Sequence, residues 1–422
     1  MLQIQLIRER HEEVVERLKI KNFDAKEIIS EILDLDIEIR NAKKSLDDNL
    51  MQQNIFSKTI GILFREGKKE EAENIKSSIA GLKSDETVLK ASLAEKEEEM
   101  ESLLVQLPNL PHISVQPGKS AEDNEMIYRE GETGAKDGML PHWELVRKYD
   151  IIDFDLGSKI TGAGFPVYKG KGAKLQRALI NFFLNNAVDE GYQEIQPPYL
   201  VNEHSAYATG QLPDKEGQMY WVTADNLYLI PTAEVPVTNI YRDVMLKEND
   251  FPIKHCAYSA CFRREAGSYG KDVRGLNRLH QFDKVEVVQI EHPDRSYETC
   301  ESMKDYVMSL LQKLGLPFRV LRLCGGDMSF TSALTYDLEV YSMAQQRWLE
   351  VSSVSNFENY QANRMKLRFK DNEGKTRLAH TLNGSALALP RIMAALIENN
   401  QTGEGISIPE VLRPYTGFDI IN

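Results

Sequence analysis

Charged residues stand inside segments that otherwise have the composition of buried strands. The stretch CFRREAGSYGKDVRG (261–275) places adjacent arginines, a glutamate and several glycines directly after a strand-like run. The stretch HQFDKVEVVQI (280–290) then alternates polar and apolar residues, as a strand does. A hairpin that served only the fold would need turn residues and not guanidinium groups. These charges therefore indicate a bound ligand.

Six charged residues share this setting in the second half of the chain. Unpaired charge among apolar neighbours is costly, and structural ion pairs could account for one or two of the six. Positions spread over separate strand-like runs predict instead one shared polar face of a sheet. A face that carries carboxylates and arginines suits a zwitterion together with a polyphosphate. The six residues are Glu234, Arg263, Glu265, Glu286, Glu339 and Glu350.

The elements that would position these residues alternate between strands and helices. Helical stretches include 171–191 and 298–315. Several strand-like runs follow one another through short connections, which favours an antiparallel β-sheet flanked by helices, in an α+β domain. These runs are 228–238, 255–264, 279–290, 335–343 and 347–357.

Residues 25–107 have a different composition, with almost no proline and an abundance of Glu, Lys, Leu, Ile and Ala. Apolar residues recur in strides of four and three from Ile28 to Leu63 and again from Ala72 to Leu103, which predicts two heptad seams. Gly67, between the seams, can supply a helix C-terminal turn. We therefore expect an antiparallel helical coiled-coil arm, each helix about 50–60 Å long.

The periodicity alone favours a dimerisation or spacer coiled coil. Basic residues toward the tip of the arm suggest a second interpretation, because a basic tip on an acidic protein suits a partner that carries phosphates. These residues are Lys58, Arg65, Lys68, Lys69 and Lys76.

Length and composition narrow the class of protein. A chain of 422 residues predicts two domains, and a net charge of −13 argues against broad adhesion to nucleic acid or acidic membranes. Four scattered cysteines suggest a reducing compartment. We see no secretory signal and no apolar run long enough to span a membrane, so we expect a soluble, cytoplasmic protein without a membrane partner.

Several stretches resemble the class II aminoacyl-tRNA synthetases, in their seryl form. FRREAGSYG with RLHQFDKVE resembles motif 2, GYQEIQPPYLV with Pro198 resembles motif 1, and LNGSALALPRIMAALIEN with Arg391 resembles motif 3. IPTAEVPVTN resembles the serine-pocket loop of the seryl-tRNA synthetase family, and EVSSVSNFENYQANR and IPEVLRPY also fit that family. With the arm, the resemblance covers essentially the whole chain in the family's order.

The resemblance implies a tRNA-binding domain at 1–108, a linker at 109–125 and a class II catalytic domain at 126–422. It implies that ATP activates L-serine to seryl-adenylate, and that serine then passes to the 3′-terminal ribose of tRNA(Ser), with tRNA(Sec) as a further candidate. The implied partners also include Mg²⁺, bound with ATP, and a second copy of the chain, joined through motif 1. The arm would contact tRNA through its basic tip.

The resemblance also implies roles for individual residues. Arg263 would bind the α-phosphate, Glu265 the adenine amino group, and Arg391 the γ-phosphate and the adenine. Phe282 would stack on the base or, alternatively, pack in the core. Glu350 and Ser353 would hold Mg²⁺, so that Arg263, Arg391 and Glu350 are the expected catalytic residues. The ATP site would also include Arg264, Val351 and Ser352. The serine pocket would comprise Thr232, Ala233, Glu234, Arg263, Glu286, Asn383 and Ser385.

Two rival functions remain open at this stage. A class II paralogue could pass an activated amino acid to a carrier protein, but such a protein would be expected to lack the long arm. A non-catalytic coiled-coil protein would be expected to lose the ATP-site residues, which are all present here. Ala386 and Pro390 depart from the usual glycines of motif 3, and Pro390 could instead begin a helix.

Overall fold

The computed structural model describes residues 1–134, 138–265 and 274–422. The chain divides into two compact units, the first formed by residues 1–19 and 23–108 and the second by residues 20–22 and 109–422. Each unit has its own architecture.

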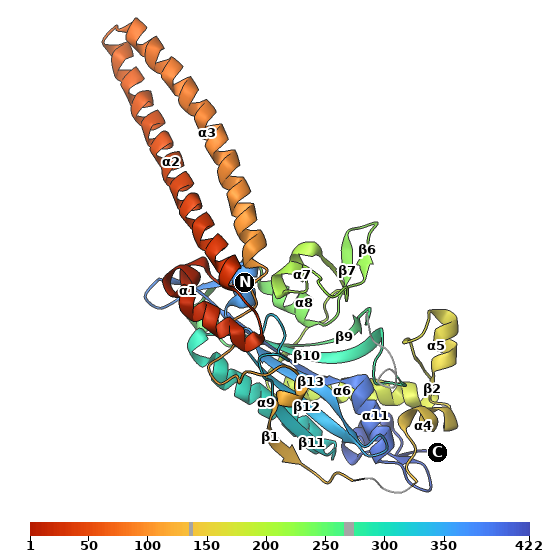
Figure 1. The fold of residues 1–422 in the computed structure, drawn as a ribbon. Coiled ribbons are helices and arrows are strands. Elements are labelled where there is room, and N and C mark those ends of the chain that lie inside the picture. Colours follow the sequence, from red (N-terminus) through yellow and green to blue (C-terminus); the bar gives the residue numbers. More distant parts are fainter. Residues whose placement is uncertain (135–137, 266–273) are drawn as a thin grey trace. The chain divides into compact units, whose positions relative to one another are not determined.

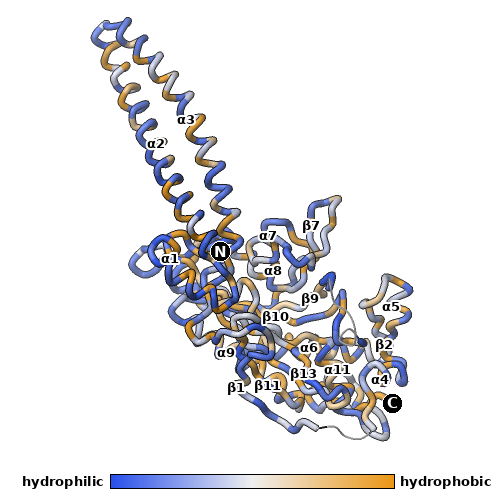
Figure 2. The backbone as a smooth tube through the Cα atoms, in the orientation of Figure 1, coloured by the Kyte–Doolittle hydropathy of each residue, from blue (hydrophilic) through white to orange (hydrophobic). Residues whose placement is uncertain are grey.

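The first unit is built on a long helical hairpin (Figure 1). Helix α1 (Ile4–Leu18) precedes α2 (Lys26–Arg65) and α3 (Lys69–Leu104), which are joined by a short turn. Gly67 occupies that turn with a φ of 77°, a conformation that glycine adopts without strain. Apolar and polar residues alternate along α2 and α3 (Figure 2), as expected for a narrow seam. The predicted antiparallel arm is confirmed.

The polar interruptions of the two seams meet in the middle of the hairpin. Gln53 Nε2 donates hydrogen bonds to Asn49 Oδ1 and to Glu86 Oε2, both at 2.8 Å. Asn49 Nδ2 donates to the carbonyl oxygen of Leu82 at 3.1 Å. Polar residues that pair across a seam fix the register of the helices, since any slip would leave them unpaired.

The second unit contains an eight-stranded sheet. All neighbouring strands are antiparallel except β4 and β9, which are parallel. The order across the sheet is β1 (Glu125–Glu130), β11 (Phe318–Arg322), β12 (Leu334–Ser342), β13 (Arg347–Asn356), β16 (His380–Ala388), β10 (Gln281–Glu291), β9 (Ile253–Phe262) and β4 (Gln193–Glu194). The predicted antiparallel sheet with flanking helices is confirmed.

One face of this sheet is covered by helices α6 (Gly170–Asp189), α9 (Ser296–Lys313) and α11 (Leu389–Asn399). Alternate residues of β10, such as Val285 and Val287, pack against them in one large apolar cluster. The intervening residues of β10 point to the opposite face. That face carries the polar residues.

Smaller elements surround the sheet. The remaining helices are α4 (His142–Lys148), α5 (Phe154–Ile160), α7 (Glu203–Thr209), α8 (Glu234–Thr238), α10 (Tyr360–Met365) and α12 (Arg413–Thr416). The remaining strands are β2 (Ile152–Asp153), β3 (Val167–Tyr168), β5 (Leu200–Asn202), β6 (Trp221–Val222), β7 (Leu227–Leu229), β8 (Met245–Lys247), β14 (Arg368–Lys370), β15 (Thr376–Leu378), β17 (Ile406–Ser407) and β18 (Ile420–Ile421). Within the described ranges, no helix has the length and apolar character needed to cross a membrane.

Candidate active site

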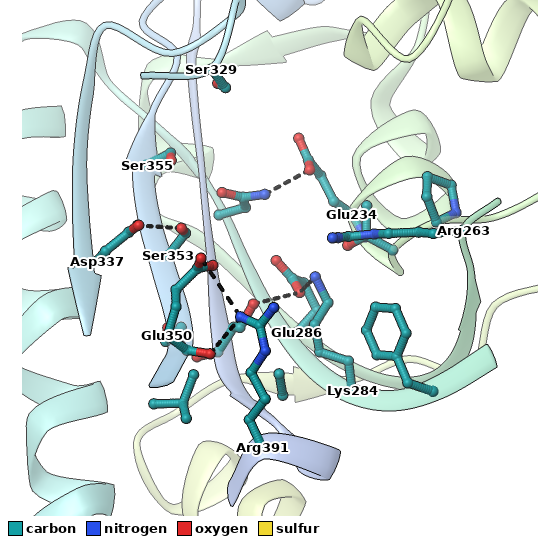
Figure 3. A pocket seen from close by; sticks show the side chains of 18 of the residues that line it. Glu234, Arg263, Lys284, Glu286, Ser329, Asp337, Glu350, Ser353, Ser355 and Arg391 are labelled. Carbon is teal, nitrogen blue, oxygen red and sulfur yellow. Dashed lines mark hydrogen bonds and ion pairs between the residues drawn. The ribbon is translucent and has the colours of Figure 1, made fainter. Parts of the chain in front are cut away.

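A cavity of about 650 Å³ opens on the polar face of the sheet (Figure 3). Its walls come from β10, β12, β13 and β16, from the residues that follow β9, and from the start of α11. Most of the predicted site residues line it together. These are Thr232, Glu234, Arg263, Glu265, Phe282, Glu286, Glu350, Val351, Ser352, Ser353, Asn383, Ser385 and Arg391.

Strand β10 contributes three side chains to the floor of the cavity. Phe282, Lys284 and Glu286 are two residues apart, so the strand geometry places all three on the same face. Lys284 Nζ lies 2.5 Å from Glu286 Oε2, and both side chains are almost fully buried. Ser385 on β16 pairs with Glu286 across the strands, and its hydroxyl lies 3.4 Å from the same carboxylate.

Arg263 stands at the first position after β9, where the hairpin leaves the sheet. Its backbone N–H donates to the carbonyl oxygen of His280 at 2.9 Å, which continues the pairing of β9 with β10. Its guanidinium lies 5.2 Å from the centre of the Phe282 ring. Glu265 pairs with Arg278 at 2.9 Å on the other side of the hairpin. A flat base and a phosphate could therefore be held next to each other here.

Glu234 is a fully buried carboxylate with two fixed hydrogen-bond donors. Gln361 Nε2 donates to Glu234 Oε1 at 2.7 Å, and Asn383 Nδ2 donates to Glu234 Oε2 at 2.6 Å. Gln361 is in turn oriented by the Thr381 hydroxyl, at 2.6 Å. Burial, together with the nearby Glu286, raises the pKa of Glu234 to about 7. The site thus presents a carboxylate whose charge a cationic ligand would stabilise.

Oxygen-bearing side chains converge on the strand β13 side of the cavity. Arg391 Nη1 donates to the carbonyl oxygen of Glu350 at 2.7 Å and lies 3.6 Å from its carboxylate. The Ser353 hydroxyl donates to Asp337, its partner across strands β12 and β13. Burial, followed by the charge of Glu350, raises the pKa of Asp337 well above its ordinary value.

These oxygen donors fit a hard cation such as Mg²⁺. The carboxylate of Glu350 is half-exposed, so it can reach a ligand in the cavity. Among the residues that the structure describes, no cluster of three His, Cys, Asp or Glu side chains could hold a metal by itself. A magnesium ion here would therefore need further oxygen ligands, which phosphates supply.

Four sequence-based expectations need correction. Glu339 does not line the cavity, because it forms an ion pair with Arg319 on the neighbouring strand. Arg264 points to solvent and Ala233 is buried in an apolar cluster, so neither lines the cavity. Glu234 lies at the start of helix α8, although its segment was expected to form a strand.

Five charged residues that line the cavity were not predicted: Glu216, Arg278, Lys284, Asp327 and Asp337. Strand alternation could have identified Lys284, since it stands midway between Phe282 and Glu286. Asp337 could have been found in the same way from its position in the predicted strand 335–343. Gln361 gives no such signal, because its link to Glu234 depends on how α10 packs beside the sheet.

An antiparallel sheet whose polar face joins a hairpin arginine to a second arginine at the start of a helix defines a class II aminoacyl-tRNA synthetase core. The family model described as "tRNA synthetase class II core domain (G, H, P, S and T)" matches residues 220–400. The model described as "Seryl-tRNA synthetase N-terminal domain" matches residues 1–111.

Full-length relatives then identify the family. A protein from Salinibacter ruber named serine–tRNA ligase is 51% identical over 99% of this chain and 98% of its own length. The seryl-tRNA synthetase of Pyrococcus horikoshii, solved in complex with ATP, is 32% identical with a TM-score of 0.91, covering 100% of this chain and 99% of its own. The cytoplasmic serine–tRNA ligase of Naegleria fowleri, solved with AMP, is 25% identical with a TM-score of 0.87, over 100% and 99% of the two chains. The chain belongs to the seryl-tRNA synthetase family.

Proposed function

We propose that the cavity activates L-serine with ATP and then transfers serine to the 3′-terminal ribose of tRNA(Ser). A serine carboxylate oxygen attacks the α-phosphorus, the bond to the β-phosphate breaks, and seryl-adenylate and pyrophosphate form. The tRNA hydroxyl then attacks the seryl carbonyl and releases AMP. The observation that carries this proposal is the convergence of Arg263, Glu234, Glu286 and Arg391 on one cavity.

The ATP half of the cavity would work by position and charge. We assign the adenine to the face of Phe282, with Glu265 at its amino group, and the α-phosphate to Arg263. Arg391 would meet the terminal phosphates. A guanidinium can bind two phosphate oxygens at once and stabilises the charge that develops as pyrophosphate leaves. Neither transfer requires a covalent bond to the protein.

Magnesium would be held with the phosphates by Glu350 and Ser353, next to Asp337. When bound, it would neutralise phosphate charge. The oxygen atoms that β12 and β13 present to the cavity support this assignment, because Mg²⁺ prefers oxygen ligands.

The serine half would use the buried carboxylates. Glu234 and Glu286 can meet the ammonium and hydroxyl groups of serine, and Lys284 neutralises Glu286 in the absence of ligand. Thr232, Asn383 and Ser385 supply further hydrogen-bonding groups on the cavity wall. A site that hydrogen-bonds the serine hydroxyl would reject alanine by a factor on the order of 10⁴, since the missing hydroxyl leaves buried polar groups unpaired.

We further propose that the arm binds tRNA, with a homodimer formed through the motif 1 segment and the reaction taking place in the cytoplasm. Residues 58–76 contain five basic and four acidic residues, so the tip has an excess of only one positive charge. Contact with tRNA would therefore depend on individual lysine and arginine side chains and on the shape of the arm. We keep tRNA(Sec) as a second candidate substrate, and we place the domain boundary near residue 108.

The test is exchange of labelled pyrophosphate into ATP with a panel of amino acids and no tRNA. We expect exchange with serine and, at equal concentration, exchange with alanine and glycine lower by at least a thousandfold. Folded protein that exchanges with another amino acid, or with none, would overturn the proposal. The next measurement compares the transfer of serine to tRNA(Ser) with its transfer to a carrier protein. Transfer to tRNA(Ser) indicates a synthetase, and transfer to the carrier protein indicates the class II paralogue.

A further inference from the structure

A buried histidine and glutamate lie behind the ATP half of the cavity. His142, the first residue of α4, and Glu398, near the end of α11, have fully buried side chains. Glu398 Oε1 accepts hydrogen bonds from His142 Nδ1 at 2.7 Å and from the His142 backbone N–H at 2.8 Å. The Ser342 hydroxyl donates to the other carboxylate oxygen.

This arrangement fixes the tautomer of His142. Burial alone would raise the pKa of Glu398, but the hydrogen bonds from His142 and Ser342 hold it below its ordinary value, so the carboxylate is ionised and accepts the Nδ1 proton. The other ring nitrogen, Nε2, then has a free lone pair. It accepts the backbone N–H of Leu276 at 2.8 Å.

Leu276 belongs to the return segment of the hairpin, defined here as residues 275–278, which forms turns and leads back to β10. Leu276, Asn277 and Arg278 all line the cavity. Gly275 has a φ of 63°, and a Cβ atom added to it would lie 2.2 Å from His142 Nε2. The return segment thus approaches the histidine so closely that only glycine fits at position 275.

His142 and Glu398 are also linked to Arg391 through a chain of hydrogen bonds. Arg391 Nε donates to the carbonyl oxygen of Asn277 at 3.1 Å, and Asn277 Nδ2 donates to Gln345 Oε1 at 2.9 Å. Gln345 Nε2 then donates to Glu398 Oε1 at 2.9 Å. Helix α11 therefore carries Arg391, which lines the cavity, in its first turn, and in its last turn it carries Glu398, which orients the histidine that binds the return segment.

We propose that His142, oriented by Glu398, is a positioning residue for ATP. Through Leu276 it holds the return segment where Arg278, Glu265 and Arg391 can contact one nucleotide. The proposal rests on the ATP-dependent function proposed above. His142 itself does not line the cavity. Substitution of His142 should therefore weaken ATP binding. Serine binding, which uses residues of β10, β16 and α8, should be unchanged.

Two substitutions of the histidine separate this role from simple packing of α4 against α11. An asparagine amide can take the place of Nδ1, so His142→Asn keeps the bond to Glu398 and loses the acceptor for Leu276. A glutamine amide reaches the place of Nε2, so His142→Gln keeps an acceptor for Leu276 and loses the bond from Nδ1. The backbone N–H of residue 142 still bonds Glu398 in both variants.

The experiment measures ATP–pyrophosphate exchange with varied ATP and with varied serine, together with thermal unfolding. We expect His142→Asn to raise KM for ATP about tenfold, because a buried N–H loses its acceptor, with KM for serine within twofold of the parent. His142→Gln should restore most of the ATP affinity. His255→Asn is the control, since His255 is a buried histidine that bonds Tyr241 and does not line the cavity.

If His142→Asn binds ATP as the parent does, or if KM rises equally for ATP and serine in step with lost stability, the proposal is wrong. Should His142→Asn not fold, Gly275→Ala tests the same contact from the return segment, because its methyl group would displace that segment from His142. It should raise KM for ATP alone, and an unchanged KM would equally contradict the proposal. A parent protein without serine-dependent exchange would instead refute the proposed function.

Discussion

At the scale of single residues, the cavity is defined by charges that are satisfied in pairs. Lys284 neutralises Glu286, Arg278 pairs with Glu265, and Arg391 lies beside Glu350. Glu234 differs from these because its partners are the neutral amides of Gln361 and Asn383. A buried carboxylate without a counter-ion is costly, and a ligand ammonium would relieve that cost.

The pKa of Glu234 predicts how the stability of the ligand-free protein depends on pH. In the unfolded chain the group ionises near its ordinary value of 4.5, whereas the folded chain holds the proton up to about pH 7. The folded state therefore binds more protons between these values, and the stability due to Glu234 is lost as the pH rises through 7. Glu234→Gln stays neutral and should not lose it.

Urea unfolding at pH 4.5 and pH 8 tests this prediction. Over that range, the parent should lose up to about 3 kcal/mol more unfolding free energy than Glu234→Gln. The matched control is Glu203→Gln, at an exposed position, which should follow the parent. If the difference in unfolding free energy between the parent and Glu234→Gln is the same at pH 4.5 and pH 8, the raised pKa is contradicted.

Sequence reasoning was most successful where a residue's role depends on local pattern. Residues such as Phe282 and Glu286 could be placed on one face because strand alternation alone determines it. Glu339 fits the same pattern, yet Arg319 on the adjacent strand β11 neutralises it. The order of strands in a sheet depends on contacts between distant parts of the chain. The local sequence of residues 335–343 therefore cannot predict that Arg319 lies beside Glu339.

At the scale of elements, helices could be predicted more completely than the strands between them. The arm helices follow from their heptads, and Pro390 lies in the first turn of α11 as its sequence position suggested. Strand β16, which carries Asn383 and Ser385, was not recognised as a strand. In its sequence, HTLNGSALA, polar and apolar residues do not alternate strongly and β-branched residues are few. The segment is a strand because it pairs with β10 and β13, and not because of its own strand propensity.

Helix α1 buries Ile7, Val14 and Leu18 and is also linked to α2 by one buried carboxylate. Asp36 accepts from Arg8 Nε at 2.9 Å and Nη2 at 2.7 Å, and from Arg40 Nε at 3.0 Å. The bond from Arg8 is the main reason that the pKa of Asp36 lies below its ordinary value. The stability that Asp36 contributes is therefore present above pH 3.8, the pKa of the group in the unfolded chain. It is lost as the pH falls through the lower pKa that Asp36 has in the folded state.

We expect Asp36→Asn to loosen α1 without changing the rest of the protein. Both arginines are partly exposed, so the loss should be about 1 kcal/mol, or about fivefold faster hydrogen exchange in the amides of α1. Mass spectrometry of peptides 4–18 measures it at pH 7. Asp34→Asn, at an exposed position on the same helix, should leave the exchange unchanged. Equal rates in the two variants would show that the pair contributes nothing.

At the scale of the whole molecule, we propose that the second unit activates the amino acid and that the arm of the first unit binds tRNA. Residues 109–422 contain every side chain that lines the cavity. The arm has a seam of its own with paired polar residues. Shortening the arm should therefore separate the two half-reactions.

The shortened protein would join Ser45 to Ala94 through a glycine-containing turn. This deletion keeps the arm base, where Lys96 pairs with Glu38 and Lys43 pairs with Glu97. Serine-dependent exchange should stay within twofold of the full chain. The kcat/KM for charging tRNA(Ser) should fall by about a hundredfold or more, since phosphate contacts supply much of the binding energy. Charging at the parent rate would show that the arm is not the tRNA-binding element.

We propose that residues far apart in the chain form one site for seryl-adenylate. The most direct measurement is rapid quenching of the protein with labelled serine, ATP and Mg²⁺, without tRNA, followed by separation of the bound products. We expect close to one equivalent of seryl-adenylate per active site in the parent, formed at least about a hundredfold more slowly by Arg263→Ala at unchanged thermal stability. Folded parent protein that forms no seryl-adenylate, or an Arg263→Ala variant that forms it at the parent rate, would contradict the account.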